Sequence, residues 1–99
     1  MFFRSESLFL RPVWPEDRAG LIAEMGESFD PELLRQDRCV PPMLITLPGD
    51  AGAALIGVGT LTRQGRNVDV SCQMAAPFRD GVYAAEARAA LRQMALLIG

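Results

Sequence analysis

The stretch that decides the fold is residues 68–74, Val68-Asp69-Val70-Ser71-Cys72-Gln73-Met74, in which apolar and polar side chains alternate strictly. Side chains that recur at every second residue lie on one face of an extended chain. One face of this segment is therefore apolar and the other polar, which is typical of a half-buried strand. We predict a β-strand over these seven residues.

The segment that follows has a different periodicity. Beyond Pro77, residues 82–98 consist mainly of good helix formers. Apolar side chains recur along one face of this segment at i, i+4, i+7 and i+11, namely Ala87, Leu91, Met94 and Ile98. This spacing predicts a long amphipathic helix.

Two apolar runs precede the alternating strand. They cover residues 43–47 and 53–62, with Pro48-Gly49-Asp50 after the first run and Gly65 after the second. Short apolar runs bounded by proline and glycine are typical of strands and turns. We predict two strands that pair as a hairpin.

The N-terminal third predicts one strand and two short helices. Residues 2–10 are rich in Phe and Leu and are soon followed by a proline, which predicts a strand. Pro15 with two acids directly after it predicts a helix over about residues 15–25, since proline suits the first helical position and acids suit the first turn. Asp30-Pro31 repeats this signal and predicts a second helix over about 31–37.

The order of these elements predicts an α+β fold with a mainly antiparallel sheet of about four strands, two short N-terminal helices and one long C-terminal helix. We expect a single domain over residues 1–99. A chain of this length is near the low end of sizes that bury a self-sufficient core, so oligomerisation is a realistic option.

Composition excludes several classes of function. The formal net charge is −2, so the electric field that draws basic proteins onto nucleic acid is absent. The sequence has no His and no Cys-x-x-Cys, which removes the usual zinc sites and His-based triads, and we expect no metal site. Cys39 and Cys72 are expected to be reduced thiols, and the protein is expected to be cytoplasmic, with no membrane segment.

Two stretches resemble one known family. Residues 7–17, SLFLRPVWPED, resemble the opening of GNAT N-acetyltransferases of the ribosomal-protein-alanine acetyltransferase kind. Residues 76–87, APFRDGVYAAEA, resemble that family's acetyl-CoA segment, in which a proline closes the fourth strand, a basic and glycine-rich turn follows, and a helix opens with Y-A-x-E-A. Residues 55–57 lie where the family carries its third strand. The resemblance covers the front of the family's fold, which continues with a fifth strand, a fourth helix and two more strands, so it implies a GNAT-like half-fold.

The resemblance implies an acetyl-CoA site in the turn before the long helix. In the family, backbone N–H groups of this turn wrap the pyrophosphate of the cofactor, and the helix N-terminus points at its charge. The cofactor-binding residues implied in this sequence are Met74, Ala75, Arg79, Asp80, Gly81, Val82, Tyr83 and Ala84.

The turn also departs from the family pattern. Val82 occupies a glycine position and is poorly suited to a positive φ, Asp80 adds a negative charge, and the turn is one residue shorter than usual. The turn therefore either binds the cofactor or is a strand-to-helix connection that keeps the family's shape without its ligand.

The resemblance implies one catalytic residue, Asp69. Family members often use a carboxylate on the fourth strand as the base for the substrate amine, and Asp69 lies at such a position. The alternative is that Asp69 is only a solvated side chain on the polar face of its strand. Tyr83 is interpreted as a packing residue.

These observations lead to competing functions. The first is an acetyl-CoA-dependent N-acyltransferase that works as a homodimer, and the second is a non-catalytic, degenerate GNAT-fold dimeric module for binding or structure. A third is a subunit that completes another GNAT-like protein. We expect a homodimer because the last strand would otherwise expose an edge and the last helix an apolar end.

Overall fold

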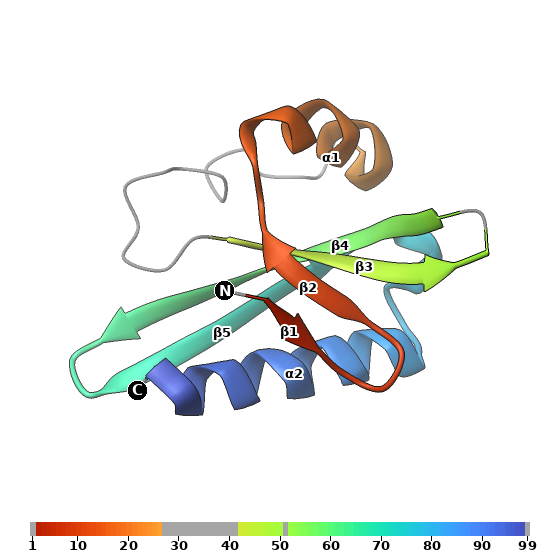
Figure 1. The fold of residues 1–99 in the computed structure, drawn as a ribbon. Helices are drawn as coiled ribbons and strands as arrows, with labels where there is room; N and C mark the ends of the chain where they lie inside the picture. The colour runs from red at the N-terminus through yellow and green to blue at the C-terminus, as the bar shows by residue number, and fades with distance from the viewer. Residues whose placement is uncertain (1, 27–41, 51, 99) are drawn as a thin grey trace.

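The protein forms one curled antiparallel sheet with a helix on each side (Figure 1). This description rests on a computed structural model that describes residues 2–26, 42–50 and 52–98. In the view of Figure 1, α1 (Arg18–Met25) lies above the sheet and α2 (Val82–Ile98) lies below it. The predicted α+β class and mainly antiparallel sheet are confirmed.

Each strand of the sheet pairs with the next one along the chain. The order is β1-β2-β3-β4-β5, and all four pairings are antiparallel. The strands are β1 (Phe3–Arg4), β2 (Phe9–Pro12), β3 (Met43–Gly49), β4 (Gly52–Gln64) and β5 (Asn67–Met74). The hairpin predicted from the two apolar runs is therefore confirmed as β3 and β4, and the alternating segment is β5.

The sheet has five strands, where the sequence predicted about four, because residues 2–10 do not form a single strand. The chain reverses after β1, so that Phe3 lies opposite Leu10. Inside this turn the N–H of Ser5 donates to the carbonyl of Leu8 over 3.0 Å. Glu86 of α2 holds the turn from outside, since its carboxylate accepts bonds from the Ser5 hydroxyl and from the Ser7 N–H. The prediction of one strand was wrong because a partner 79 residues away fixes the turn.

The predicted helix over residues 15–25 is confirmed as a 3₁₀ turn (Pro15–Asp17) that continues into α1. Asp17 fixes its start by accepting a bond from the N–H of Trp14 over 2.8 Å and two bonds from Arg11 over 2.7 and 2.9 Å. The bond from Arg11 is the main reason that the pKa of Asp17 is lowered. The second predicted helix, over residues 31–37, lies outside the described residues.

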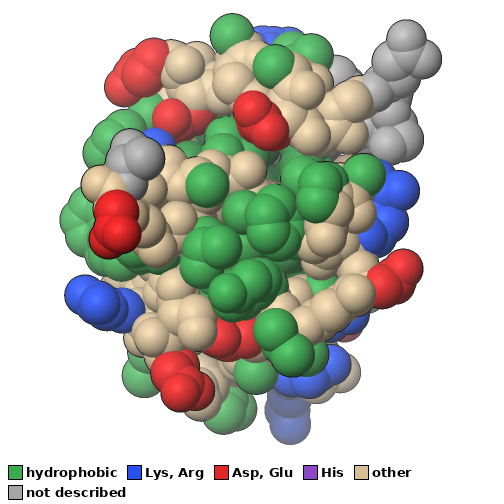
Figure 2. All heavy atoms as spheres, turned by 90° about the vertical axis from the view of Figure 1, so that its right-hand side faces the viewer, with side chains coloured by type: hydrophobic (Ala, Val, Ile, Leu, Met, Phe, Trp, Pro, Cys, Tyr) green, Lys and Arg blue, Asp and Glu red, His purple; other side chains and the backbone are tan. Residues whose placement is uncertain are grey.

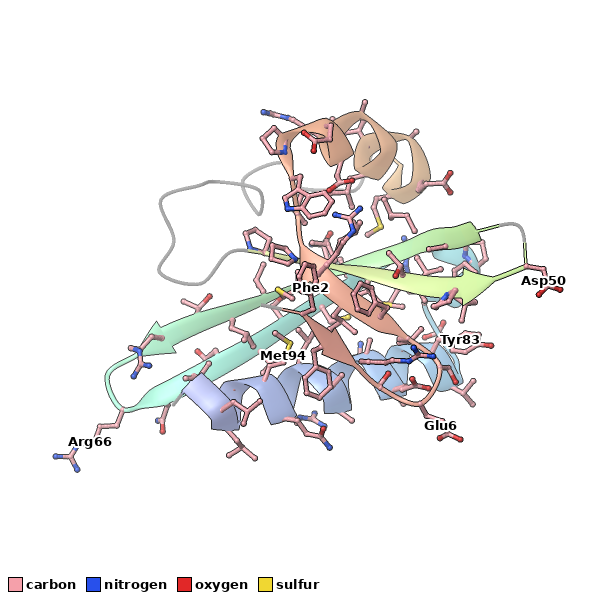
Figure 3. All side chains as sticks on the ribbon, viewed as in Figure 1. Phe2, Glu6, Asp50, Arg66, Tyr83 and Met94 are labelled. Carbon is pink, nitrogen blue, oxygen red and sulfur yellow. The ribbon has the colours of Figure 1, made fainter. Side chains whose placement is uncertain are left out.

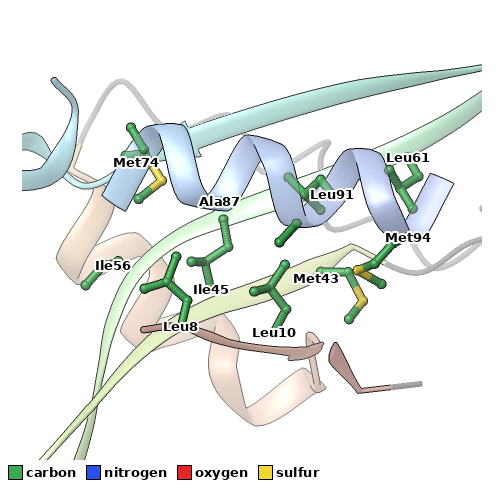
Figure 4. Packing of buried hydrophobic residues seen from close by; sticks show 12 residues of the cluster. Leu8, Leu10, Met43, Ile45, Ile56, Leu61, Met74, Ala87, Leu91 and Met94 are labelled. Carbon is green, nitrogen blue, oxygen red and sulfur yellow. The ribbon is translucent and has the colours of Figure 1, made fainter. Parts of the chain in front are cut away.

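The larger part of the core lies between the sheet and α2 (Figure 4). Ala87, Leu91 and Met94 point from α2 into this cluster and are fully buried, as their spacing predicted. Gly59 of β4 allows the close approach, because a Cβ at that position would lie 2.5 Å from Cδ1 of Leu91. The helix therefore packs directly on the backbone of β4.

A second, smaller cluster lies between the sheet and α1. Its buried members are Val13, Leu21, Met25, Leu44, Val58 and Ala75. Because the sheet is covered on both faces here, neighbouring residues such as Leu44 and Ile45 are both buried, one on each side. Because β3 is covered on both faces, its sequence is a continuous apolar run. β5 is half-buried, so apolar and polar residues alternate along it.

The half-buried strand β5 carries Cys72 on its apolar face. Cys72 is a free thiol, and burial raises its pKa, against the opposing effect of the positive charge of Arg88. Cys39 lies outside the described residues. None of the helices that the structure describes is long and apolar enough to cross a membrane.

Candidate functional site

The proposed cofactor segment is the turn that joins β5 to α2, and its two ends are built into the core. Met74 and Ala75 are buried, and the N–H of Ala75 donates to the carbonyl of Ile56 over 2.7 Å. At the other end, Ala84 is buried under α2. These three residues, which the sequence implied as cofactor contacts, hold the turn in place from inside the protein.

A 3₁₀ turn (Ala76–Phe78) supports the middle of the segment. The N–H groups of Phe78 and Arg79 donate to the carbonyls of Ala75 and Ala76 over 2.8 and 3.3 Å. Tyr83 is half-buried and lies against the ring of Phe78, with 6.2 Å between ring centroids. The arrangement agrees with the interpretation of Tyr83 as a packing residue.

The remaining residues form an exposed rim at the start of α2. Arg79, Asp80, Gly81 and Val82 are all exposed, and Val82 exposes 77% of its surface. The helix ladder begins where the N–H of Ala85 donates to the carbonyl of Gly81 over 3.3 Å. The N–H groups of the preceding helical residues have no acceptor within the helix, and no acidic residue lies in this first turn to neutralise them.

The departures from the family pattern place no strain on the backbone. Among the described residues, only glycines have a positive φ. Val82 therefore does not adopt the left-handed backbone conformation that favours glycine. Gly81 does not have a positive φ either, and a Cβ built on it would meet nothing within 4 Å. Space is therefore open beside the Cα of Gly81, the residue before the helix, and an anion is favoured at a helix N-terminus.

A hollow of about 280 Å³ opens beside this rim, lined by Met25, Gln73, Met74 and Arg79. We call it the first-turn hollow. Figure 2 shows the face of the molecule that carries the β3–β4 turn and the start of α2, and hydrophobic side chains gather in the middle of this face. The hollow thus combines an apolar lining with one cationic side chain, Arg79.

Sequence reasoning missed Met25 and Gln73 as parts of this site. Met25 lies at the end of α1, far from Gln73 and Met74 in the sequence. Nothing in the sequence indicates where this end of the helix lies in space. Gln73 lies on the polar face of β5, which was recognised, but only its position next to the turn makes it a lining residue.

The structure does not bring Asp69 to this hollow. Asp69 is exposed on β5 opposite Thr62, on the same face as Gln73 but four residues earlier. At the rise of an extended chain, this places it roughly 13 Å from Gln73. Among the described residues that line the first-turn hollow, none is a carboxylate.

Glu86, the acid of the Y-A-x-E-A stretch, has a structural contact. It binds the turn between β1 and β2, as described above. Burial acts to raise the pKa of Glu86, but the hydrogen bonds from Ser5 and Ser7 outweigh this effect and lower the pKa. In the part of the chain that the structure describes, no group of three or more His, Cys, Asp or Glu side chains is placed to hold a metal ion.

Comparison with known proteins adds no relative to this picture. No protein-family model, no curated protein and no solved structure matches the chain.

Proposed function

We propose that the protein is a GNAT-like protein that binds acetyl-CoA at the turn from β5 to α2. In this proposal the pyrophosphate lies on the exposed N–H groups at the start of α2, and Arg79 pairs with a phosphate oxygen. The thioester arm of the cofactor lies in the first-turn hollow against Met25 and Met74.

The observation that carries the proposal is the coincidence of three features at one place. A long helix begins there with no acid in its first turn, Arg79 stands beside it, and an apolar hollow opens next to both. Acetyl-CoA has the matching chemistry, with an anionic centre and a slender, largely apolar arm. The order of the described elements, strands, helix, three antiparallel strands and helix, also agrees with the order that the resemblance implies.

The proposed reaction is N-acyl transfer. The nitrogen of a substrate amine attacks the thioester carbonyl, the new C–N bond forms, the C–S bond breaks, and CoA leaves as the thiol after the amine proton has been transferred. Asp69 is the proposed base; because roughly 13 Å separates it from Gln73, more than one water molecule spans, the amine proton would have to reach it along a chain of several waters. The acceptor is an amine.

A second function is favoured by the lining of the hollow. Because none of the described lining residues is a carboxylate, the site fits a non-catalytic module that binds a CoA-like ligand without transferring the acyl group. The two functions differ in one measurement, the release of CoA thiol from acetyl-CoA in the presence of amines. Thiol release that Asp69→Asn abolishes supports the enzyme, and ligand binding without thiol release supports the module.

We also propose that the protein is a homodimer that buries Leu97, near the end of α2. Leu97 exposes 72% of its surface there, and a contact with a second copy would remove this large apolar side chain from water. Sedimentation velocity of the protein and of Leu97→Glu tests this, since a monomeric wild type would contradict the proposal.

The binding proposal is tested by thermal unfolding with millimolar acetyl-CoA, with desulfo-CoA and ATP as controls. At a ligand concentration near 100 times Kd, the stabilisation is about 2.7 kcal/mol, which for a domain of this size raises the midpoint by roughly ten degrees or more. A rise with acetyl-CoA and desulfo-CoA but not with ATP supports a CoA site. No rise with any of the three contradicts it.

A further inference from the structure

The outer edge of β5 is open and lacks the features that normally block a sheet edge. β5 is the last strand of the sheet, and no other described residue pairs with its outer side. Its pairing with β4 is regular over eight residue pairs, without a bulge. The strand contains no proline and only one charge, Asp69. Natural proteins usually protect such an edge with bulges, prolines or several charges, so an unprotected edge indicates a partner strand.

The ladder shows which backbone groups this edge offers. Since the N–H of Ala75 donates to Ile56, the pair Ile56–Ala75 is a hydrogen-bonded one, and every second pair before it is too. The residues between those pairs therefore direct their N–H and C=O groups away from β4. These residues are Val68, Val70, Cys72 and Met74.

A row of positive charge lies above this edge. Glu86 marks the side of α2 that faces the β1–β2 turn. At 3.6 residues per turn, Arg88 and Arg92 lie about 200° and 240° around the helix from Glu86, on the side of β5. Two observations agree with this placement: Ala95, at about 180°, lines a hollow together with Val68, and the charge of Arg88 acts on the thiol of Cys72. Both arginines are exposed.

The spacing of the two arginines matches the spacing of side chains on a strand. Arg88 and Arg92 are four residues apart, which is about 6 Å along a helix. Side chains at i and i+2 of a strand are about 6.7 Å apart and lie on the same face. Two carboxylates at i and i+2 of an added strand can therefore each reach one arginine.

A second hollow lies farther along the same edge. It has a volume of about 260 Å³ and is lined by Arg66, Asn67, Val68, Ala95 and Leu96, and we call it the hairpin hollow. Figure 3 shows Arg66 at the tip of the hairpin between β4 and β5, at the opposite end of α2 from Tyr83. The hollow lies next to Val68. An apolar side chain at i+4 of an added strand would lie opposite Val68 and would point toward the hollow.

We infer that the edge of β5 binds an extended segment of a partner protein, added antiparallel to β5, with acidic side chains at i and i+2 and an apolar side chain at i+4. The backbone of the segment pairs with the outward groups of Val68, Val70 and Cys72. Its carboxylates pair with Arg88 and Arg92, and its apolar side chain fills the hairpin hollow.

A second copy of this chain fits the edge less well than an acidic segment does. β5 presents Val68, Val70, Cys72 and Met74 on the face toward α2, so a paired copy would place no carboxylate beside the arginines. It would also bring the Arg88 and Arg92 pairs of both copies together, and like charges at such a contact are unfavourable.

The test uses a fluorescein-labelled peptide, Thr-Glu-Thr-Glu-Lys-Val-Thr, followed by fluorescence anisotropy. In antiparallel register its glutamates lie opposite Cys72 and Val70, its valine opposite Val68, and its lysine opposite Asp69. We expect saturable binding that weakens with added salt, and at least tenfold weaker binding to the double variant Arg88→Glu/Arg92→Glu. Arg18→Glu, a reversal of an exposed charge on α1, is the matched control and should bind as the wild type does.

Two further measurements separate strand addition from simple charge attraction. A peptide methylated on the backbone nitrogens of its glutamates and valine keeps its charge but cannot pair with β5, and it should not bind. Hydrogen exchange should show that the amides of Val68, Val70 and Cys72 become protected only when the unmodified peptide is present. No binding at millimolar peptide, equal binding of the methylated peptide, or protection of these amides in the protein alone through self-association would each overturn the inference.

Discussion

The two hollows are similar in volume and in the types of residue that line them. One lies at the first turn of α2 and the other lies near its last turn. The first-turn hollow of about 280 Å³ holds Arg79 with Met25 and Met74, and the hairpin hollow of about 260 Å³ holds Arg66 with Val68 and Leu96 among its lining residues. The helix dipole is positive at the first turn and negative at the last. Only the first-turn hollow therefore combines an arginine with a helix end that favours a small anion.

The two proposals therefore assign different ligands to hollows whose lining residues are of similar types. At the first turn, arginine and helix add their effects on a phosphate. At the last turn, the negative helix end disfavours any anion, so the carboxylates of the proposed strand pair with Arg88 and Arg92, which lie more than one turn before that end. Four predictions test this comparison.

The largest expected effect is the loss of stability caused by a substitution in the middle of α2, between the two hollows. Leu91 is fully buried against Gly59, and Leu91→Ala should lower the free energy of unfolding by about 3 kcal/mol. For a domain of this size, the midpoint of thermal unfolding should fall by about 12 °C or more. Gln93→Ala, at an exposed position on the same helix, should change it by no more than a few degrees. Equal effects of the two substitutions would contradict the packing described for α2.

The second prediction separates the two hollows by their arginines. Arg79→Ala should weaken acetyl-CoA binding about tenfold, because it removes one charge-assisted hydrogen bond to a phosphate. Arg66→Ala removes no contact with the cofactor, so the affinity should stay within about twofold of that of the wild type. The tenfold loss expected for Arg79→Ala corresponds to about 1.4 kcal/mol. Isothermal titration calorimetry measures both, and equal losses would show that general positive charge, and not the first turn, attracts the ligand.

The third prediction concerns the contact that holds the β1–β2 turn against the first half of α2. Glu86→Gln should destabilise the protein by about 1 kcal/mol at neutral pH, because the bonds from Ser5 and Ser7 lose their charged acceptor. The pKa of Glu86 is lower in the folded protein than its ordinary value of 4.5. Its contribution is therefore fully present above pH 4.5 and is lost as the pH falls through the folded pKa.

Urea unfolding at several pH values tests this dependence. The stability difference between wild type and Glu86→Gln should shrink as the pH falls below 4.5. Gln93→Ala, which changes an exposed side chain of α2 that does not titrate, should show no such trend. A difference that stays constant from pH 7 to pH 3 would show that the contact does not depend on the charge of Glu86.

The smallest expected effect on stability is the most diagnostic for the first turn. Val82→Asp places a carboxylate at an exposed position beside the unpaired N–H groups, which should stabilise the protein by about 0.5 kcal/mol. The same carboxylate should repel the cofactor phosphates, so the thermal shift with acetyl-CoA should disappear. Stability and ligand response thus change in opposite directions, and an unchanged ligand response would place the cofactor elsewhere.

Much of the fold could be predicted because its elements have clear local patterns. The alternation in β5 and the apolar stripe of α2 are periodic over many residues, and both elements were predicted almost to their ends. Pro15 with its two acids was enough to predict the start of the first helix. In each case the signal lies within the element itself.

The missed features depend on contacts between distant parts of the chain. Ser5, Glu6 and Ser7 lie in a Phe-rich segment that predicts one strand, and only Glu86 shows why the chain turns there. Met25 enters the first-turn hollow because the end of α1 lies beside Gln73 and Met74, which no local pattern indicates. The expectation that Val82 is poorly suited to its position was wrong, because the turn requires no positive φ there.

The most direct test of the proposed site is a titration of the ¹⁵N-labelled protein with acetyl-CoA, followed through its backbone amide resonances. We expect saturable shifts of the amides of Gly81, Val82 and Tyr83, while those of Asn67 and Val68 at the hairpin end stay in place. Unchanged resonances at millimolar acetyl-CoA, or shifts confined to the hairpin end, would contradict an anion site at the first turn of α2.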